Sequence, residues 1–227
     1  MPFNNSTFDV AAERRFFEAK SDIVNHYRSM LCPCGSDPSM ALNTCALCGG
    51  MGRIYPGIPI QKRVILSRVE QSDPELVAQG LAIAGDLVMS EPIGDPVPAE
   101  EFDIIIPQWG GVPFAGQLVT RSSGSTDTLF YQAVTVDKCI TVDPATGAIT
   151  DYVPGVDFTW QDKTITWLTS HAPPTGAVYS IRYTAIFEYV VFAPALLRRE
   201  RGTDLGARVL LRKRHLVLPN LPDILAG

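Results

Sequence analysis

Several features that mark enzymes, membrane proteins and repeat proteins are missing from this sequence. The first twenty or so residues hold no basic segment followed by an apolar run, so we expect no secretory signal. No stretch approaches the roughly 18 consecutive apolar residues of a membrane-spanning helix. The chain also lacks a G-x-S-x-G elbow, a phosphate-binding loop, a dinucleotide fingerprint and a convincing internal repeat. We therefore expect a protein that is neither an enzyme nor a membrane protein, made in a cytosol.

The chain has a small negative net charge and three histidines, and both features limit the functions that it can have. The net charge of −5 argues against a general binder of nucleic acid or membrane surfaces. His26, His171 and His215 stand far apart, and no motif in the sequence pairs any of them with a nucleophile or with a second metal ligand. Hydrophobic residues make up 46% of the chain and charged residues 19%, which predicts an ordered core.

Cysteine is present in one concentrated stretch. Four of the five cysteines occur as Cys32-Pro-Cys34 and Cys45-Ala-Leu-Cys48, and Gly-Gly-Met-Gly follows the second pair. Short-spaced cysteine pairs can supply the four thiolates of a tetrahedral zinc site, and glycines permit the tight turn behind the metal. Because four cysteines fill the coordination shell, the sequence predicts a structural zinc ion and no metal-based catalysis.

Two other interpretations of the cysteine cluster remain open. One or two disulfides would form in an oxidising medium. A redox pair is disfavoured because the CALC sequence is not part of a βαβ pattern and has no lysine or histidine close by in the sequence. The fifth cysteine, Cys139, falls in a predicted strand, where we expect a buried free thiol.

The rest of the chain predicts mainly antiparallel β structure, in a sandwich or barrel, behind one N-terminal helix. The helix is expected from about Asp9 to Met30, with Ser6, Thr7 or Asp9 as its N-cap. Strands are expected over 60–70, 81–90, 101–109, 128–142 and 178–192, with a hairpin at 161–163 and two C-terminal strands joined by a turn at 202–206. These elements suggest four parts: a helix (1–31), a zinc module (32–58), a first β segment (59–120) and a second β domain (121–227).

Charge is distributed unevenly along the chain. Residues 70–103 contain acidic residues and no lysine or arginine, whereas residues 198–214 are strongly basic. Two solvated faces would explain this pattern. The alternative is a head-to-tail contact in which the acidic part of one copy meets the basic strands of the next. The residues expected at that contact are Glu91, Glu100, Glu101, Asp103, Arg198, Arg199, Arg201, Arg208, Arg212, Lys213 and Arg214.

The order of these features resembles the neck proteins of tailed bacteriophage virions, which sit between head and tail. The resemblance rests on the C-x-C…C-x-x-C-G-G-x-G cluster, on DYVPGVDFTWQDKTITW (151–167) and on PPTGAVYSIRYTA (173–185). It implies a structural protein that forms a ring of six or twelve copies around the DNA channel and contacts portal-side, neck and tail proteins. It also implies location in the virion after assembly in the bacterial cytoplasm, contact with passing DNA without sequence recognition, and no membrane partner.

Three other assignments remain open at this stage. A baseplate or tail-tip protein would carry the same β pattern. A zinc-knuckle module that binds client proteins would use a similar cysteine motif, although such proteins usually repeat it. An enzyme would need a catalytic site that the sequence does not reveal.

Overall fold

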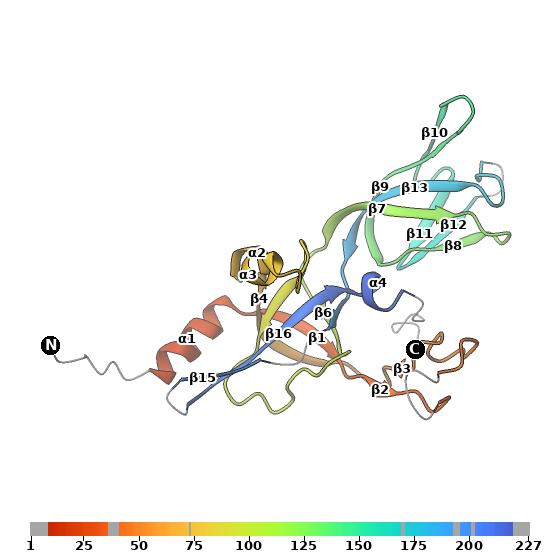
Figure 1. Cartoon of the computed structure of the whole chain (residues 1–227). Coiled ribbons are helices and arrows are strands. Elements are labelled where there is room, and N and C mark those ends of the chain that lie inside the picture. Colours follow the sequence, from red (N-terminus) through yellow and green to blue (C-terminus); the bar gives the residue numbers. More distant parts are fainter. Residues whose placement is uncertain are drawn as a thin grey trace. The chain divides into compact units, whose positions relative to one another are not determined.

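The chain forms two compact β units, seen in a computed structural model that describes residues 9–35, 41–72, 74–168, 171–192, 196–200 and 203–219. Unit 1 comprises residues 1–108 and 188–227, and unit 2 comprises residues 109–187. Strands dominate both units (Figure 1). The predicted mainly β fold with an N-terminal helix is therefore confirmed.

Unit 1 is a closed antiparallel barrel. Six strands follow one another in the order β14-β6-β1-β4-β5-β16, and β14 also pairs with β16, which closes the ring. The strands are β1 (Asp22–Tyr27), β4 (Ile60–Arg68), β5 (Leu87–Ser90), β6 (Ile104–Pro107), β14 (Tyr189–Val191) and β16 (Thr203–Lys213). A seventh strand, β15 (Leu196–Glu200), forms a hairpin with β16.

The core of unit 1 draws fully buried side chains from all six barrel strands: Val24, Val64, Met89, Ile105, Val190 and Leu211. Short helices lie outside the barrel strands. Helices α2 (Val69–Ser72) and α3 (Pro74–Ala78) place Val69, Leu76 and Val77 against Val88 and Leu210, and α4 (Arg214–Val217) follows β16. Among the described residues, no helix combines the length and the apolar character needed to cross a bilayer.

Helix α1 (Val10–Lys20) is shorter than the sequence predicted. Asp9 is its N-cap, and its carboxylate accepts hydrogen bonds from the backbone N–H groups of Ala11 and Ala12. The expected helix over 9–30 is wrong beyond Lys20, because Asp22–Tyr27 pairs on both sides as β1, with β4 and with β6. The other two N-cap candidates lie outside the described residues.

Unit 2 contains a four-stranded sheet and a three-stranded sheet. The first has the order β10-β9-β13-β7, and the second has the order β11-β12-β8. Their bounds are β7 (Val112–Thr120), β8 (Thr126–Thr128), β9 (Gln132–Val142), β10 (Ile149–Tyr152), β11 (Phe158–Gln161), β12 (Thr164–Trp167) and β13 (Val178–Ile186). Trp167 of β12 meets Tyr179 of β13 edge to face at 5.2 Å, so aromatic rings join the two sheets.

Several predicted strands are confirmed, and others are shifted. Ile60–Arg68 matches the prediction, and the β11–β12 hairpin turns where predicted, with Asp162 at φ 51°. The strand expected over 81–90 begins only at Leu87. The long strand expected over 178–192 is divided, since β13 belongs to unit 2 and β14 to unit 1. Of the turn expected at 202–206, residues from Thr203 onward already belong to β16.

The predicted four-part division is therefore replaced by an insertion. Strands β6 and β14 are paired neighbours in the barrel, and the chain between them forms all of unit 2. The predicted boundary at 120 and 121 falls inside unit 2, and residues 188–219 return to unit 1. Local sequence patterns indicate strands, but they carry little information about a pairing between residues as far apart as Ile105 and Tyr189.

Candidate metal centre

The four clustered cysteines come together in a small module attached to unit 1. Strand β2 (Met30–Leu31) pairs with β3 (Arg53–Ile54), and the cysteine loops extend from this short ladder. The N–H of Cys32 donates to the carbonyl of Gly52 at 2.9 Å, which extends the closure by one residue. The β2–β3 ladder therefore holds both cysteine pairs, Cys32/Cys34 and Cys45/Cys48, at one of its ends.

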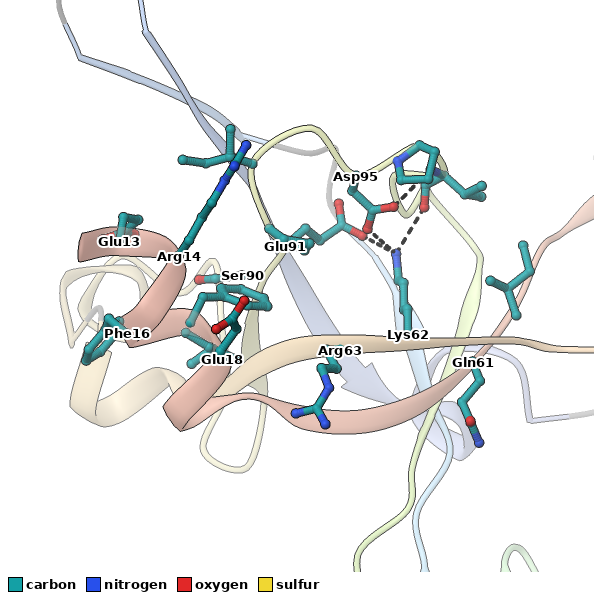
Figure 2. A pocket seen from close by; sticks show the side chains of 17 residues that line it. Glu13, Arg14, Phe16, Glu18, Gln61, Lys62, Arg63, Ser90, Glu91 and Asp95 are labelled. Carbon is teal, nitrogen blue, oxygen red and sulfur yellow. Dashed lines mark hydrogen bonds and ion pairs between the residues drawn. The ribbon is translucent and has the colours of Figure 1, made fainter. Parts of the chain in front are cut away.

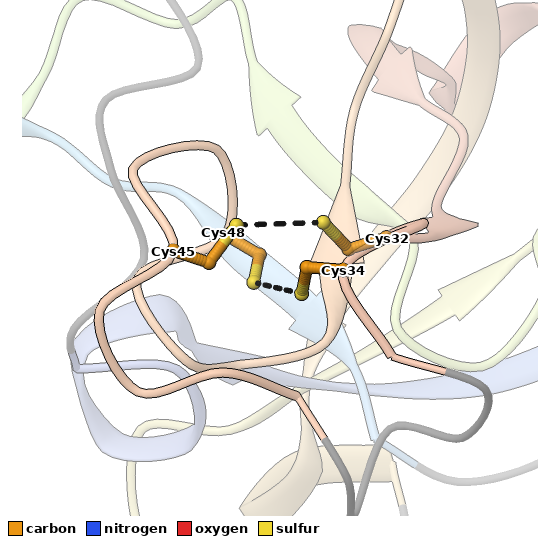
Figure 3. Close-up of side chains that lie close together, drawn as sticks. All are labelled: Cys32, Cys34, Cys45 and Cys48. Carbon is orange, nitrogen blue, oxygen red and sulfur yellow. Dashed lines mark hydrogen bonds between the residues drawn. The ribbon is translucent and has the colours of Figure 1, made fainter.

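The sulfur atoms face one another around a common centre (Figure 3). All four Sγ atoms lie within 4.8 Å of one another. The distance is 3.8 Å from Cys32 to Cys45 and 3.6 Å from Cys34 to Cys48. A disulfide would require about 2.05 Å. The cysteines are therefore free thiols arranged as a possible metal site, and the disulfide alternative is not the form seen here.

Local backbone geometry shapes the second pair of ligands. Gly49, Gly50 and Gly52 have φ values of 55°, 83° and 71°, which L side chains rarely adopt. A Cβ atom on Gly50 would also lie 3.0 Å from the Cα of Asn43. The glycines after Cys48 therefore serve the turn and the close backbone approach that the sequence predicted for them.

Backbone amides surround the sulfur atoms and shift their acidity. The N–H groups of Cys48 and Leu47 donate to the sulfur of Cys45 and lower its pKa to about 7. The N–H of Cys34 likewise lowers the pKa of Cys32, but burial and the neighbouring thiols raise it by more, so the net pKa of Cys32 is raised. Cys45 thus forms the thiolate that metals bind more readily than Cys32 does.

Burial separates the fifth cysteine from this centre. Cys139 is 1% exposed within unit 2, and burial raises its pKa to about 12. Its sulfur atom is not part of the group of cysteine sulfur atoms that lie close together. Within the described part of the chain, Cys32, Cys34, Cys45 and Cys48 are the one group of histidine, cysteine and acidic side chains close enough to share an ion.

The residues predicted to form a charged contact surface divide into exposed and buried sets. Glu91 is 3% exposed and pairs with Lys62, while Asp103 is 1% exposed and accepts a 2.7 Å hydrogen bond from the ring of His26. Because both carboxylates are buried inside unit 1, they do not form an outer acidic surface, which corrects that expectation. Glu100 and Glu101 are exposed, as an interface requires.

The basic part of the predicted contact is also used internally. Arg212 binds both carboxylate oxygens of Asp86 at 3.2 Å or less, and Arg214 pairs with Glu188 at 2.8 Å with its side chain 8% exposed. Burial lowers the pKa of Lys213, and Arg208 is half-buried. The side chains of Arg198 and Arg199, and the whole of Arg201, lie outside the described residues.

Sequence reasoning missed the buried polar pairs of both units. His26 pairs with Asp103, and in unit 2 Asp127 accepts hydrogen bonds from Trp167 Nε1 at 2.7 Å and from Tyr179 Oη at 3.1 Å. Partners in these pairs are 40 to 77 residues apart in the sequence, so no local motif predicts them.

Comparison with known proteins adds no assignment: no protein-family model matches the chain, and no curated protein is significantly similar to it.

Proposed function

We propose that the four cysteines hold one structural zinc ion per chain. Tetrahedral Zn–S bonds of about 2.3 Å would place the sulfur atoms about 3.8 Å apart. The two measured sulfur distances, 3.8 Å and 3.6 Å, support this proposal. With four thiolates the ion has no open position for water or substrate, so its role is to stabilise the loops of the module.

We further propose that the chain is a structural protein of a tailed-phage virion that forms a ring in the head–tail neck. The observation that carries this proposal is the strand succession of unit 2. The β11–β12 hairpin and β13 hold the two motifs that resemble neck proteins. A closed thiolate site attached to a barrel also favours a building block over a catalyst. In this proposal the ring surrounds the DNA channel and joins portal-side, neck and tail proteins.

Because Glu91 and Asp103 are buried, fewer acidic side chains can contact a neighbouring subunit in such a ring than the sequence suggested. Glu100 and Glu101 are exposed, and Arg28 reaches Glu100 at 3.4 Å with both side chains more than half exposed. An exposed pair of this kind contributes little to folding and can exchange partners on assembly. We therefore assign the acidic half of the subunit contact to Glu100 and Glu101.

Native mass spectrometry of the full chain before and after chelation tests both proposals separately. We expect rings of six or twelve copies with one zinc ion per copy. A stable monomer that retains zinc would contradict the ring and leave the metal site intact. A metal-free ring would contradict the zinc proposal alone. Localisation of the labelled chain in virions would distinguish the neck from the baseplate.

A further inference from the structure

A groove in unit 1 lies between α1, β4 and the loop after β5. Its volume is about 560 Å³. Figure 2 shows Phe16 and Glu18 extending from α1 on one side, with Lys62 and Glu91 at the loop end. The apolar part of the lining includes Phe16 and Phe17 of α1 and Ile93 of the loop after β5. The exposed surface of this groove is mainly apolar and has charged side chains along its edges, which is the character of a binding site.

Helix α1 does not fill the groove that it borders. The helix has 11 residues and no buried side chain, and Phe16 is 55% exposed. Isolated helices shorter than about 12 to 15 residues are marginally stable in water, so a surface helix of this length depends on packing. An occupant that covers Phe16 and Phe17 would supply the packing that α1 lacks.

The loop end of the groove carries an unbalanced charge. Lys62 Nζ donates to Glu91 Oε1, to Asp95 Oδ2 at 3.3 Å and to the carbonyl of Val97 at 3.1 Å. Two carboxylates thus share one ammonium group. Glu91 has a side chain that is 1% exposed, and its buried Oε2 atom has no hydrogen-bond partner in the described part of the chain.

Because the two carboxylates face a single ammonium group, this end of the groove favours an additional cation. The remaining charged side chains of the lining balance, since Glu13 and Glu18 are matched by Arg14 and Arg63. The excess negative charge is therefore local to Glu91 and Asp95. An occupant that is apolar along its length and cationic at one end matches this distribution.

We propose that the groove binds a segment of a partner protein that presents an apolar side chain next to a lysine or arginine. The apolar group packs between Phe16 and Ile93, and the ammonium or guanidinium group lies at the loop end of the groove, next to Asp95 and Glu91. This inference goes beyond the proposed ring and does not depend on it, because it concerns a site within one unit of a single chain.

Three small probes with the same alkyl chain test the proposal: hexylamine, hexanol and hexanoate. Each is titrated into the zinc-loaded full chain, with amide NMR shifts and hydrogen exchange of α1 as readouts. We expect hexylamine to bind about tenfold more tightly than hexanoate, as one charge-assisted hydrogen bond implies, and to slow exchange in α1. Absence of saturable hexylamine binding up to millimolar concentrations would overturn the proposal. Equal binding of the three probes would overturn its cationic part.

Variants assign the effect to the groove. Phe16→Ser removes an exposed aromatic side chain from the lining of the groove. It should lower the affinities for hexylamine and hexanol alike, by about tenfold, without loss of folding. Leu118→Ser, at a 69% exposed apolar residue of unit 2, is the matched control and should change neither affinity. Glu91→Gln should reduce the preference for hexylamine over hexanol. If that variant does not fold, the comparison of hexylamine with hexanoate on the unaltered chain decides.

Discussion

At the scale of single residues, the cysteines separate into ligands and a buried thiol. We predict that Cys45→Ser lowers metal affinity by more than the roughly 10- to 100-fold that changes outside the ligand shell produce, because it removes a ligand. Cys139→Ser is the matched control and should leave the metal content unchanged. Metal content by mass spectrometry and the thermal unfolding of unit 1 check this prediction. Full metal retention by Cys45→Ser would exclude four-sulfur ligation.

The carboxylate of Asp127 anchors the core of unit 2. It accepts hydrogen bonds from the backbone N–H of Ser122, from Trp167 and from Tyr179. Asp127→Ala leaves these donors unpaired in a buried site, and we expect a loss of about 2–4 kcal/mol in the free energy of unfolding. Denaturant unfolding followed by tryptophan fluorescence measures it. Asp151→Ala, at a residue exposed on β10, should cost less than about 1 kcal/mol.

The same carboxylates predict how stability depends on pH. Burial raises the pKa of Asp103 and Asp127, but hydrogen bonds outweigh burial, so both pKa values lie below the ordinary value. The stabilisation is fully present above the unfolded pKa of about 3.9 and is lost as the pH falls through the lower folded pKa. Unfolding free energy should therefore decline below about pH 4. Asp127→Asn should flatten part of that decline.

At the scale of elements, Gly206 allows β16 to pass close to the loop after β5. Its φ is +82°, and an added Cβ would lie 2.2 Å from the carbonyl oxygen of Glu91. Gly206→Ala should therefore destabilise unit 1 by about 2–4 kcal/mol, because it adds a backbone clash to the strain of positive φ. Gly147 also has a positive φ, but an added Cβ would meet no neighbouring atom there. Gly147→Ala therefore measures the cost of the backbone strain alone, which we expect to be about 1 kcal/mol in the free energy of unfolding. Equal effects of the two variants in denaturant unfolding would contradict the close approach.

Prediction from sequence succeeded where a signal was local and failed where a partner was distant. The cysteine spacing, the Asp9 cap and the hairpin at Asp162 each depend on a few adjacent residues. Residues 22–27 were assigned to a helix because Ile23, Val24 and Tyr27 also fit a helical spacing. From Ile23 to His26, buried and more exposed side chains alternate, but apolar and polar residue types do not, because the polar His26 is buried and the apolar Ile23 is exposed. A buried histidine is stable there because of Asp103, whose identity as its partner no local pattern reveals.

The charged segments show the same limit. The sequence suggested that residues 70–103 of one copy meet residues 198–214 of the next, whereas the structure shows Asp86 and Arg212 of these segments paired within one chain. Arg212 binds Asp86 and also stacks over Phe192 at 4.1 Å. Removal of one partner from such a pair leaves the other charge without its partner and destabilises the fold. The net charge of a segment therefore predicts that its side chains pair with side chains of opposite charge. It does not predict whether those partners belong to the same chain or to another copy.

At the scale of the whole molecule, the insertion of unit 2 predicts that unit 1 folds alone. Strands β6 and β14 are already paired in the barrel, so a short glycine- and serine-rich turn from Gln108 to Glu188 can replace residues 109–187. We expect the shortened chain to retain cooperative unfolding and one equivalent of metal. Circular dichroism and metal analysis check this. A shortened chain without cooperative unfolding would show that the two units depend on each other.

The same insertion has a mechanical consequence. Unit 2 is joined to unit 1 by two covalent connections, at the end of β6 and at the start of β14, and these two strands are adjacent in the barrel. A force along these strands moves both together, so the hydrogen bonds between them carry little of the load. The load falls on the ladders that join β6 to β1 and β14 to β16. These ladders lie parallel to the force and must shear as a whole, which is the arrangement in which β structure resists tension best.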